Sequence, residues 1–202
     1  MKPKPTILTT RYTDAVAYAT AIHATQVRKG TSVPYIAHLL GVSSLVLEAG
    51  GSEDEAIAAL LHDCVEDCGG MAREADVRVR FGDRVADIVL GCSDSTDERW
   101  KASVGYWTRK RSYLDHLAKA DDATLLVSMA DKVHNARAIA TDLQRYGVDV
   151  LEKFNAPPRR IVAYYRGCAK IGKRRGVSMA LLKPLRTALD TIEAYVEYDR
   201  SR

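Results

Sequence analysis

Apolar residues recur every three or four positions along most of the chain, which is the spacing of an amphipathic α-helix. The strict alternation of apolar and polar residues that marks a half-buried strand is not sustained over any long stretch. The periodic stretches predict helices over residues 14–28, 36–49, 52–67, 71–82, 83–94, 106–120, 121–147, 157–174 and 178–200. Glycine and proline separate several of these stretches, so the sequence predicts an all-α fold of about eight to ten helices.

Polar residues and prolines define several helix boundaries. Ser52 is followed three residues later by Glu55, which is the spacing of a capping box. Asp14 or Thr13 is the expected cap of the first helix, and Pro158 is suited to the first turn of another. Pro184 predicts a kink or break within the last helix, because proline lacks the backbone N–H.

The predicted helix over residues 52–67 ends in an unusual set of side chains. His62 and Asp63 are adjacent, and Glu66 and Asp67 follow one turn later. On one continuous helix, His62 would neighbour Glu66 and Asp63 would neighbour Asp67. A shared divalent cation would offset the repulsion among these groups and the cost of burying them. The alternative is a solvated acidic helix end, although acids there oppose the helix dipole.

Two other polar residues interrupt apolar helical runs. His38 lies in "PYIAHLL" and Asp131 lies in "SMADKVHNARAI". A single histidine or aspartate in such a setting is most often a core residue bonded to the backbone. Misfits on three separate helices are better explained together, as a set of two histidines and two aspartates that includes His62 and Asp63. Such a set would bind a metal ion and leave positions for water and substrate.

Composition narrows the class of protein. The 202 residues suit one domain, with a possible terminal extension, and 47% apolar and 28% charged residues are typical of a soluble globular chain. A net charge of +4 does not favour a nucleic-acid partner, but it is compatible with an anionic small molecule. The N-terminus lacks a signal-peptide core, and no apolar run is long enough to predict a membrane partner.

The four cysteines, Cys64, Cys68, Cys92 and Cys168, form no Cys-x-x-Cys pair. They are expected to be free thiols in a reducing compartment, which predicts a cytoplasmic protein. A zinc site at Cys64 and Cys68 is the less favoured alternative.

Four motifs occur in order along the chain: "RKGTSVPYIAH", "AALLHDCVED", "FGDRVADIVLGCSD" and "MADKVHNAR". Together they resemble the HD-domain metal phosphohydrolases, and in particular the hydrolase domain of the RelA/SpoT alarmone enzymes. The chain length is similar to that of the stand-alone small alarmone hydrolases. The resemblance runs from Tyr12 to Ile171 and implies an HD-domain helical bundle over residues 1–175. Residues 176–202 are then expected to form a C-terminal helical extension packed on that domain.

The resemblance also implies roles for individual residues. The implied metal ligands, usually for manganese, are His38, His62, Asp63 and Asp131. The implied acids that position and activate the attacking water are Glu66 and Asp67. The implied substrate contacts are Arg28 and Lys29 in a basic loop, Asn135 at the nucleoside, and Tyr164 as an aromatic contact, for which Tyr165 is an alternative. Leu39 and Cys64 replace residues common in relatives, but neither change removes a functional group.

The implied activity is hydrolysis of a small-molecule nucleotide substrate. The enzyme would remove the 3′-pyrophosphate from (p)ppGpp-type alarmones, with adenosine analogues as alternative substrates, and would release a 5′-nucleotide and pyrophosphate. Another HD-family nucleotidase or phosphatase, and a non-catalytic alarmone sensor, are the competing interpretations; the paired acids and the basic loop favour the hydrolase. No oligomeric state is predicted.

Several other polar residues have less defined roles. Arg109, Lys110 and Arg111 either contact phosphate or form a solvated helix face. His134 is expected to be a supporting or structural residue. The sequence assigns no role to His23 or His116.

Overall fold

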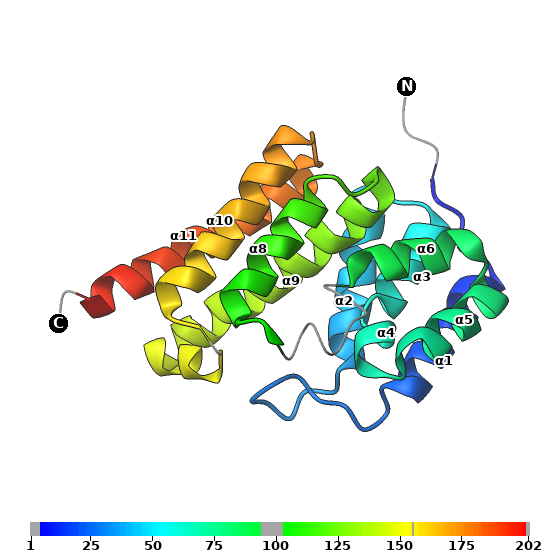
Figure 1. Cartoon of the computed structure of the whole chain (residues 1–202), viewed down its shortest axis with the longest axis horizontal. Helices are drawn as coiled ribbons and strands as arrows, with labels where there is room; N and C mark the ends of the chain where they lie inside the picture. Colours follow the sequence, from blue (N-terminus) through cyan, green and yellow to red (C-terminus); the bar gives the residue numbers. More distant parts are fainter. Residues whose placement is uncertain (1–4, 94–102, 155, 201–202) are drawn as a thin grey trace. The chain divides into compact units, whose positions relative to one another are not determined.

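The computed structural model describes residues 5–93, 103–154 and 156–200, with side chains described up to residue 198. Within these ranges the chain forms ten α-helices and one 3₁₀-helix, with an isolated bridge between Val27 and Pro34 in place of any strand. The predicted all-α fold is therefore confirmed (Figure 1). Contacts divide the chain into two units, Met1–Thr96 with Asp121–Ala130, and Asp97–Ala120 with Asp131–Arg202. Residues 94–102, which lie between the helices predicted over residues 83–94 and 106–120 and include the last residue of the first, are outside the described residues.

The first unit contains six complete helices and the start of a seventh. They are α1 (Thr10–Ile22), α2 (Ile36–Glu48), α3 (Glu53–Leu61), α4 (Cys64–Asp67), α5 (Gly70–Phe81), α6 (Asp83–Cys92) and the beginning of α9 (Asp122–Tyr146). Helix α3 packs against α1, α2 and α6. Its residues from Ala56 to Leu61 are all fully buried, because an uninterrupted apolar sequence makes the helix apolar on every side. This buried helix carries the chain into the His62–Asp63 pair.

The start of α3 is as predicted. The hydroxyl of Ser52 accepts from the Glu55 N–H, and the Glu55 carboxylate accepts from the Ser52 N–H at 2.6 Å, so both bonds of the capping box are present. The single helix predicted over residues 52–67 is wrong, because α3 ends at Leu61 and α4 starts at Cys64. In an unbroken helix the Ala59 carbonyl would accept a hydrogen bond from the Asp63 N–H. Here it accepts one from His62 Nδ1 at 2.9 Å.

The first helix begins earlier and ends earlier than predicted. Thr9, not Thr13 or Asp14, is the N-cap, and its backbone N–H and hydroxyl both donate to Glu53 at the start of α3. This tertiary contact extends the helix towards the N-terminus. At the other end the chain leaves the helix after Ile22, and the bridge between Val27 and Pro34 closes a loop.

The second unit contains α8 (Tyr106–Leu117), the rest of α9, the 3₁₀-helix η1 (Val148–Lys153), α10 (Pro158–Arg174) and α11 (Met179–Arg200). Helix α10 packs against α8 and α11, and α11 also contacts η1. A kink or break was predicted at Pro184, and the break is wrong, because α11 continues through this residue. The missing N–H would bond to the carbonyl of Ala180, an exposed residue where water can satisfy that carbonyl. No helix in the described part of the chain is both long and apolar enough to span a membrane.

Candidate metal centre and active site

Two histidines from different helices meet in the first unit. His38 lies in the first turn of α2, and His62 lies at the end of α3. Their side chains are 1% and 4% exposed, and the ring centroids are 5.3 Å apart at an angle of 66°. The sequence predicted that these residues share a site, and α3, packed against α2, brings them together.

The hydrogen bond of His62 to the backbone selects one tautomer. A carbonyl oxygen only accepts, so the 2.9 Å contact between His62 Nδ1 and the Ala59 oxygen places the proton on Nδ1. In the neutral ring, the lone pair is then on Nε2. Histidines that bind metals are commonly held in this way by a bond from the second ring nitrogen.

Asp63 borders the histidine pair. Its Oδ2 atom lies 3.0 Å from His62 Nε2 and 3.7 Å from His38 Nε2, and it accepts a 2.5 Å hydrogen bond from the Tyr35 hydroxyl. The Asp63 side chain is 25% exposed, so it is the most accessible of these groups. The Tyr35 ring also packs edge-on against His38, with centroids 5.4 Å apart. Tyr35 therefore supports two predicted ligands, and the sequence interpretation had missed it.

Asp131 follows the Asp121–Ala130 segment directly on the unbroken helix α9. Among the described residues, His38, His62 and Asp131 form a group whose nitrogen and carboxylate ligand atoms lie within 4.8 Å of one another. All three are buried. Buried imidazole and carboxylate groups with converging lone pairs fit a divalent metal ion. Cys64 and Cys68 do not belong to this group, and both are free thiols.

Two neighbours on α9 hold the Asp131 carboxylate. Asn135 Nδ2 donates to Oδ1, and Lys132 Nζ donates to Oδ2. The Lys132 ammonium also lies 4.7 Å from the centroid of the Tyr113 ring. Burial disfavours the ammonium, but the charges of Asp131, Tyr113 and Tyr164 and the hydrogen bond to Asp131 together raise the pKa of Lys132 well above its usual value. The sequence interpretation missed Lys132, since a lysine after an aspartate carries no signal of burial.

The two predicted acids lie on the short helix α4. Glu66 and Asp67 are both exposed. Protein groups crowded around Asp67 raise its pKa by desolvation, while a 2.8 Å hydrogen bond from Gln26 Nε2 acts in the opposite direction. An exposed carboxylate with a raised pKa is suited to accept a proton from a substrate-bound water.

Arg28 and Lys29 lie in the loop that follows α1. The Arg28 N–H donates to the Val33 carbonyl at 2.8 Å, and the bridge between Val27 and Pro34 closes the loop. The Arg28 guanidinium lies 6.0 Å from the centroid of the Tyr35 ring, and Lys29 is exposed. Arg28, one member of the predicted basic pair, thus lies near the tyrosine that supports Asp63.

The remaining predicted contacts lie in the second unit. Tyr164 and Tyr165 are adjacent on α10, both buried, with ring centroids 5.4 Å apart. The Lys110 ammonium lies 5.2 Å from the Tyr164 ring centroid and 5.8 Å from that of Tyr113. Of the three basic residues in "RKR", Lys110 is therefore the one placed against the predicted aromatic contact, whereas Arg111 is exposed.

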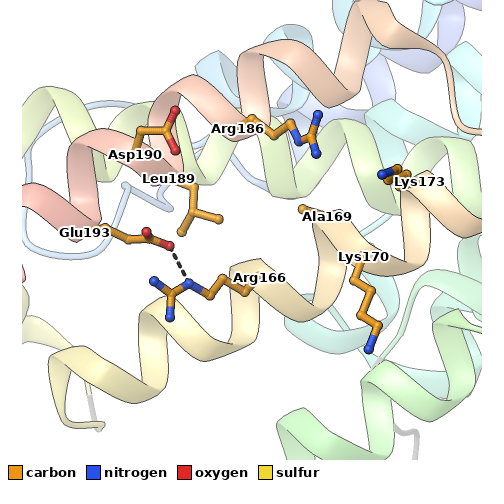
Figure 2. A pocket seen from close by; sticks show the side chains of 8 residues that line it. All are labelled: Arg166, Ala169, Lys170, Lys173, Arg186, Leu189, Asp190 and Glu193. Carbon is orange, nitrogen blue, oxygen red and sulfur yellow. Dashed lines mark hydrogen bonds and ion pairs between the residues drawn. The ribbon is translucent and has the colours of Figure 1, made fainter.

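A groove of about 610 Å³ between α10 and α11 contains none of the predicted site residues (Figure 2). Its lining residues are Arg166, Ala169, Lys170, Lys173, Arg186, Leu189, Asp190 and Glu193. Arg166 Nε donates to Glu193 at 2.6 Å and connects the two helices. The groove is an exposed helix–helix seam of mixed charge and lacks the buried, converging ligands of the metal centre.

Comparison with known proteins defines the class. Residues 15–153 match the HD domain family, and the chain belongs to that family. It is 36% identical over 135 residues to the guanosine-3′,5′-bis(diphosphate) 3′-pyrophosphohydrolase MESH1 of Xenopus tropicalis, a match that covers 65% of this chain and 69% of the relative. The predicted family resemblance is confirmed.

A longer bacterial relative and a solved structure agree with this assignment. The chain is 34% identical over 126 residues to the guanosine-3′,5′-bis(diphosphate) 3′-pyrophosphohydrolase of Aquifex aeolicus, covering 62% of this chain but 17% of that protein. It also superposes, with a TM-score of 0.71 and 28% identity, on a metazoan ortholog of SpoT described as hydrolysing ppGpp. That match covers 92% of this chain and 97% of the other.

Proposed function

We propose that this chain is an alarmone hydrolase that removes the 3′-pyrophosphate from (p)ppGpp-type nucleotides and releases a 5′-nucleotide and pyrophosphate. The observation that carries the proposal is the convergence of the buried His38, His62 and Asp131 ligand atoms in an HD-family chain. Relatives named for this reaction, and a structural neighbour described as hydrolysing ppGpp, support it.

The proposed metal ligands are His38, His62, Asp63 and Asp131, and the proposed ion is Mn²⁺. Support comes from the donor set, because mixed imidazole and carboxylate ligands suit Mn²⁺ among several divalent metals. The Nδ1 bond of His62 supports its role by leaving Nε2 as the ligand atom. When bound, the ion would supply positive charge beside the phosphate and increase the acidity of water.

The chain's own groups would move the proton. Water attacks the phosphorus linked to the ribose 3′-oxygen, and Glu66 or Asp67 accepts the proton that the water loses. The bond between that phosphorus and the 3′-oxygen breaks, so pyrophosphate is released and the 3′-oxygen takes up a proton to become a hydroxyl. The exposure of both acids on α4 supports this role, because a substrate from solution can reach them.

The substrate contacts are proposed in both units. Arg28 and Lys29 would bind phosphate, and their loop supports this because it places the Arg28 guanidinium near Tyr35 and leaves Lys29 exposed. Asn135 and Tyr164 would contact the nucleoside, and Tyr165 is the alternative to Tyr164. The Lys110 ammonium beside Tyr164 adds a cation that attracts phosphate.

We also propose that residues 1–175 form the catalytic domain and that residues 176–202 form a helical extension packed on it. The packing of α11 against α10 supports the packed position of the extension. The cytoplasmic location expected from the sequence stays a prediction.

A turnover assay tests the proposed function. Metal-supplemented wild-type protein and Asp63→Ala are incubated with ppGpp and, in parallel, with its adenosine counterpart, and the products are resolved. We expect pyrophosphate release by the wild type and its loss in Asp63→Ala, with the relative rates showing the base preference. Release of inorganic phosphate would instead indicate another HD-family phosphatase, and a lack of turnover of both nucleotides would contradict the proposal. Metal analysis of protein purified with Mn²⁺, Fe²⁺ or Zn²⁺ tests the proposed ion.

A further inference from the structure

The side chain of Gln26 connects a buried histidine with one of the proposed catalytic acids. Its Oε1 atom lies 2.5 Å from His23 Nδ1, and its Nε2 atom donates to Asp67 Oδ2 at 2.8 Å. A carboxylate only accepts hydrogen bonds, so the Gln26 amide must direct its NH₂ group towards Asp67. The amide oxygen then faces His23, and His23 Nδ1 must carry the proton that it donates.

His23 is held firmly enough to set this direction. It caps the C-terminus of α1, its backbone N–H donates to the Ala19 carbonyl at 3.1 Å, and its side chain is buried. Its ring stacks on Tyr35 with centroids 5.3 Å apart and an interplanar angle of 29°. The same Tyr35 donates to Asp63. The buried His23 ring therefore contacts both Gln26, which bonds to Asp67, and Tyr35, which bonds to Asp63.

The Asp67 side chain, unlike that of His23, is not buried. Asp67 is the last residue of the four-residue helix α4, and its side chain is exposed. An exposed aspartate samples several rotamers, and a general base must lie within hydrogen-bond reach of the proton that it accepts. The bond from Gln26 links this carboxylate to a side chain that also bonds to the buried His23.

We propose that Gln26 is a positioning residue for Asp67, and that His23 fixes the direction in which Gln26 donates. This inference rests on the proposed function, in which Asp67 acts on the attacking water. It also gives a role to His23, to which the sequence assigned none.

The charges around Asp67 show why the bond matters for its ionisation. Desolvation raises the pKa of Asp67, and the Asp63 carboxylate raises it further, while Gln26, His23 and His62 lower it. Removing the Gln26 donor therefore moves the Asp67 pKa upwards and reduces the fraction of carboxylate at neutral pH.

The first test uses Gln26→Leu in the metal-loaded full chain with ppGpp as substrate. We expect kcat to fall about tenfold, as part of the roughly 10²–10⁴-fold contribution of a positioned proton acceptor. KM should change less than about twofold, and the acid limb of the kcat profile should move to higher pH. Gln144→Leu, the same change at an exposed site on α9, is the matched control. Unchanged kcat and an unchanged acid limb in Gln26→Leu would overturn the proposal.

Variants of His23 test the direction of the bond. His23→Asn keeps an N–H donor near the position of Nδ1, whereas His23→Phe keeps an aromatic ring against Tyr35 but has no donor. We expect His23→Asn to retain most of kcat and His23→Phe to lose about as much as Gln26→Leu. Equal activity of the two variants, each shown to be folded by circular dichroism, would contradict the role of His23.

A measurement independent of activity separates failure of this inference from failure of the proposed function. The Asp67 carboxyl pKa can be read by NMR of ¹³C-labelled aspartate in wild type and in Gln26→Leu. An identical Asp67 pKa in both proteins overturns the positioning role, whatever the activity. Wild-type protein that releases no pyrophosphate contradicts the proposed function, while an upward pKa shift in Gln26→Leu would still support the hydrogen-bond chain.

Discussion

The hydroxyl of Tyr35 donates a 2.5 Å hydrogen bond to Oδ2 of Asp63, although 28 positions separate the two residues in the sequence. The same tyrosine stacks on His23, packs edge-on against His38 and lies near the Arg28 guanidinium. One aromatic ring thus connects the basic loop with the predicted metal ligands. Bonds to ligand side chains orient them and alter metal affinity, so this contact has measurable consequences.

Replacing Tyr35 by Phe removes the hydroxyl and keeps the ring. We expect the affinity for a divalent metal and kcat each to fall about tenfold, since outer hydrogen bonds to metal ligands contribute roughly 10–100-fold. Calorimetric titration of chelator-treated protein with Mn²⁺ and a pyrophosphate-release assay measure the two effects. Tyr12→Phe, which removes a hydroxyl bonded to Ser43 at 2.9 Å, is the control and should leave metal affinity unchanged. A Tyr35→Phe metal affinity within twofold of wild type would contradict the expectation.

Replacing Lys132 by Met leaves the Asp131 carboxylate without its ammonium partner. The pair is 13% and 8% exposed, and removing one member of a buried ion pair costs about 3–5 kcal/mol. We expect the metal-free variant to lose roughly that much free energy of unfolding in urea, and added divalent metal to restore part of it. Lys153→Met is the control, because its ion pair with Asp142 is 23% and 24% exposed. A loss no larger than that of the control would show that Lys132 contributes little.

Gly51 has no room for a side chain. A Cβ atom there would lie 2.5 Å from Val46 Cγ1 and 2.9 Å from the Val46 carbonyl oxygen, and a backbone oxygen cannot move aside as a flexible side chain can. We expect Gly51→Ala to lower the free energy of unfolding by about 1–3 kcal/mol, the usual cost of overpacking. Gly105→Ala, where a Cβ meets no described atom within 4 Å, should cost less than about 1 kcal/mol. Equal effects in chemical denaturation would refute the steric explanation.

The acid stability of the first unit depends in part on Asp76. The hydroxyl of Tyr18 donates to this carboxylate at 2.5 Å and Arg80 Nε donates at 2.7 Å, and these bonds lower the pKa of Asp76. A pKa that is lower in the folded state than in the unfolded chain stabilises the fold above the unfolded value, about 3.9. That contribution is lost as the pH falls through the folded pKa.

The corresponding measurement is the difference in unfolding free energy between wild type and Asp76→Asn across pH. We expect a constant difference in favour of wild type above about pH 5, which shrinks as the pH falls below about 4. A difference that does not change with pH would show that the stabilisation does not come from the ionised carboxylate.

The sequence predicted the helices well where local signals and tertiary contacts agree. The capping box at Ser52 and Pro158 in the first turn of α10 both mark boundaries that the structure confirms. The sequence failed at two helix features that local signals do not describe. A tertiary contact with Glu53 extends α1 to Thr10, and a water-accessible backbone carbonyl lets α11 continue through Pro184. The 3₁₀-helix over Val148–Lys153 was not predicted, because short 3₁₀ segments have no apolar period of their own.

The candidate site was likewise predicted only as far as local sequence signals reach. His38, His62 and Asp131 were identified because polar residues in apolar helical runs are costly unless they share a partner, and their ligand atoms do converge. His23, Tyr35 and Lys132 were missed, because each becomes informative only through a neighbour far along the chain or through burial. His23 in particular has an ordinary helix-face position in the sequence, yet the residue is only 3% exposed in the structure.

Residue spacing by itself therefore determined the helical class and singled out His38, His62 and Asp131, while the order of four motifs indicated the family through its resemblance to known enzymes. The helical class follows from apolar periodicity, and the three residues follow from the cost of burying unshared polar groups. The tertiary structure alone decided the break between α3 and α4, the tautomer of His62 and the bond from Gln26 to Asp67. These depend on which distant atoms come within hydrogen-bonding distance, and packing of the helices sets that distance.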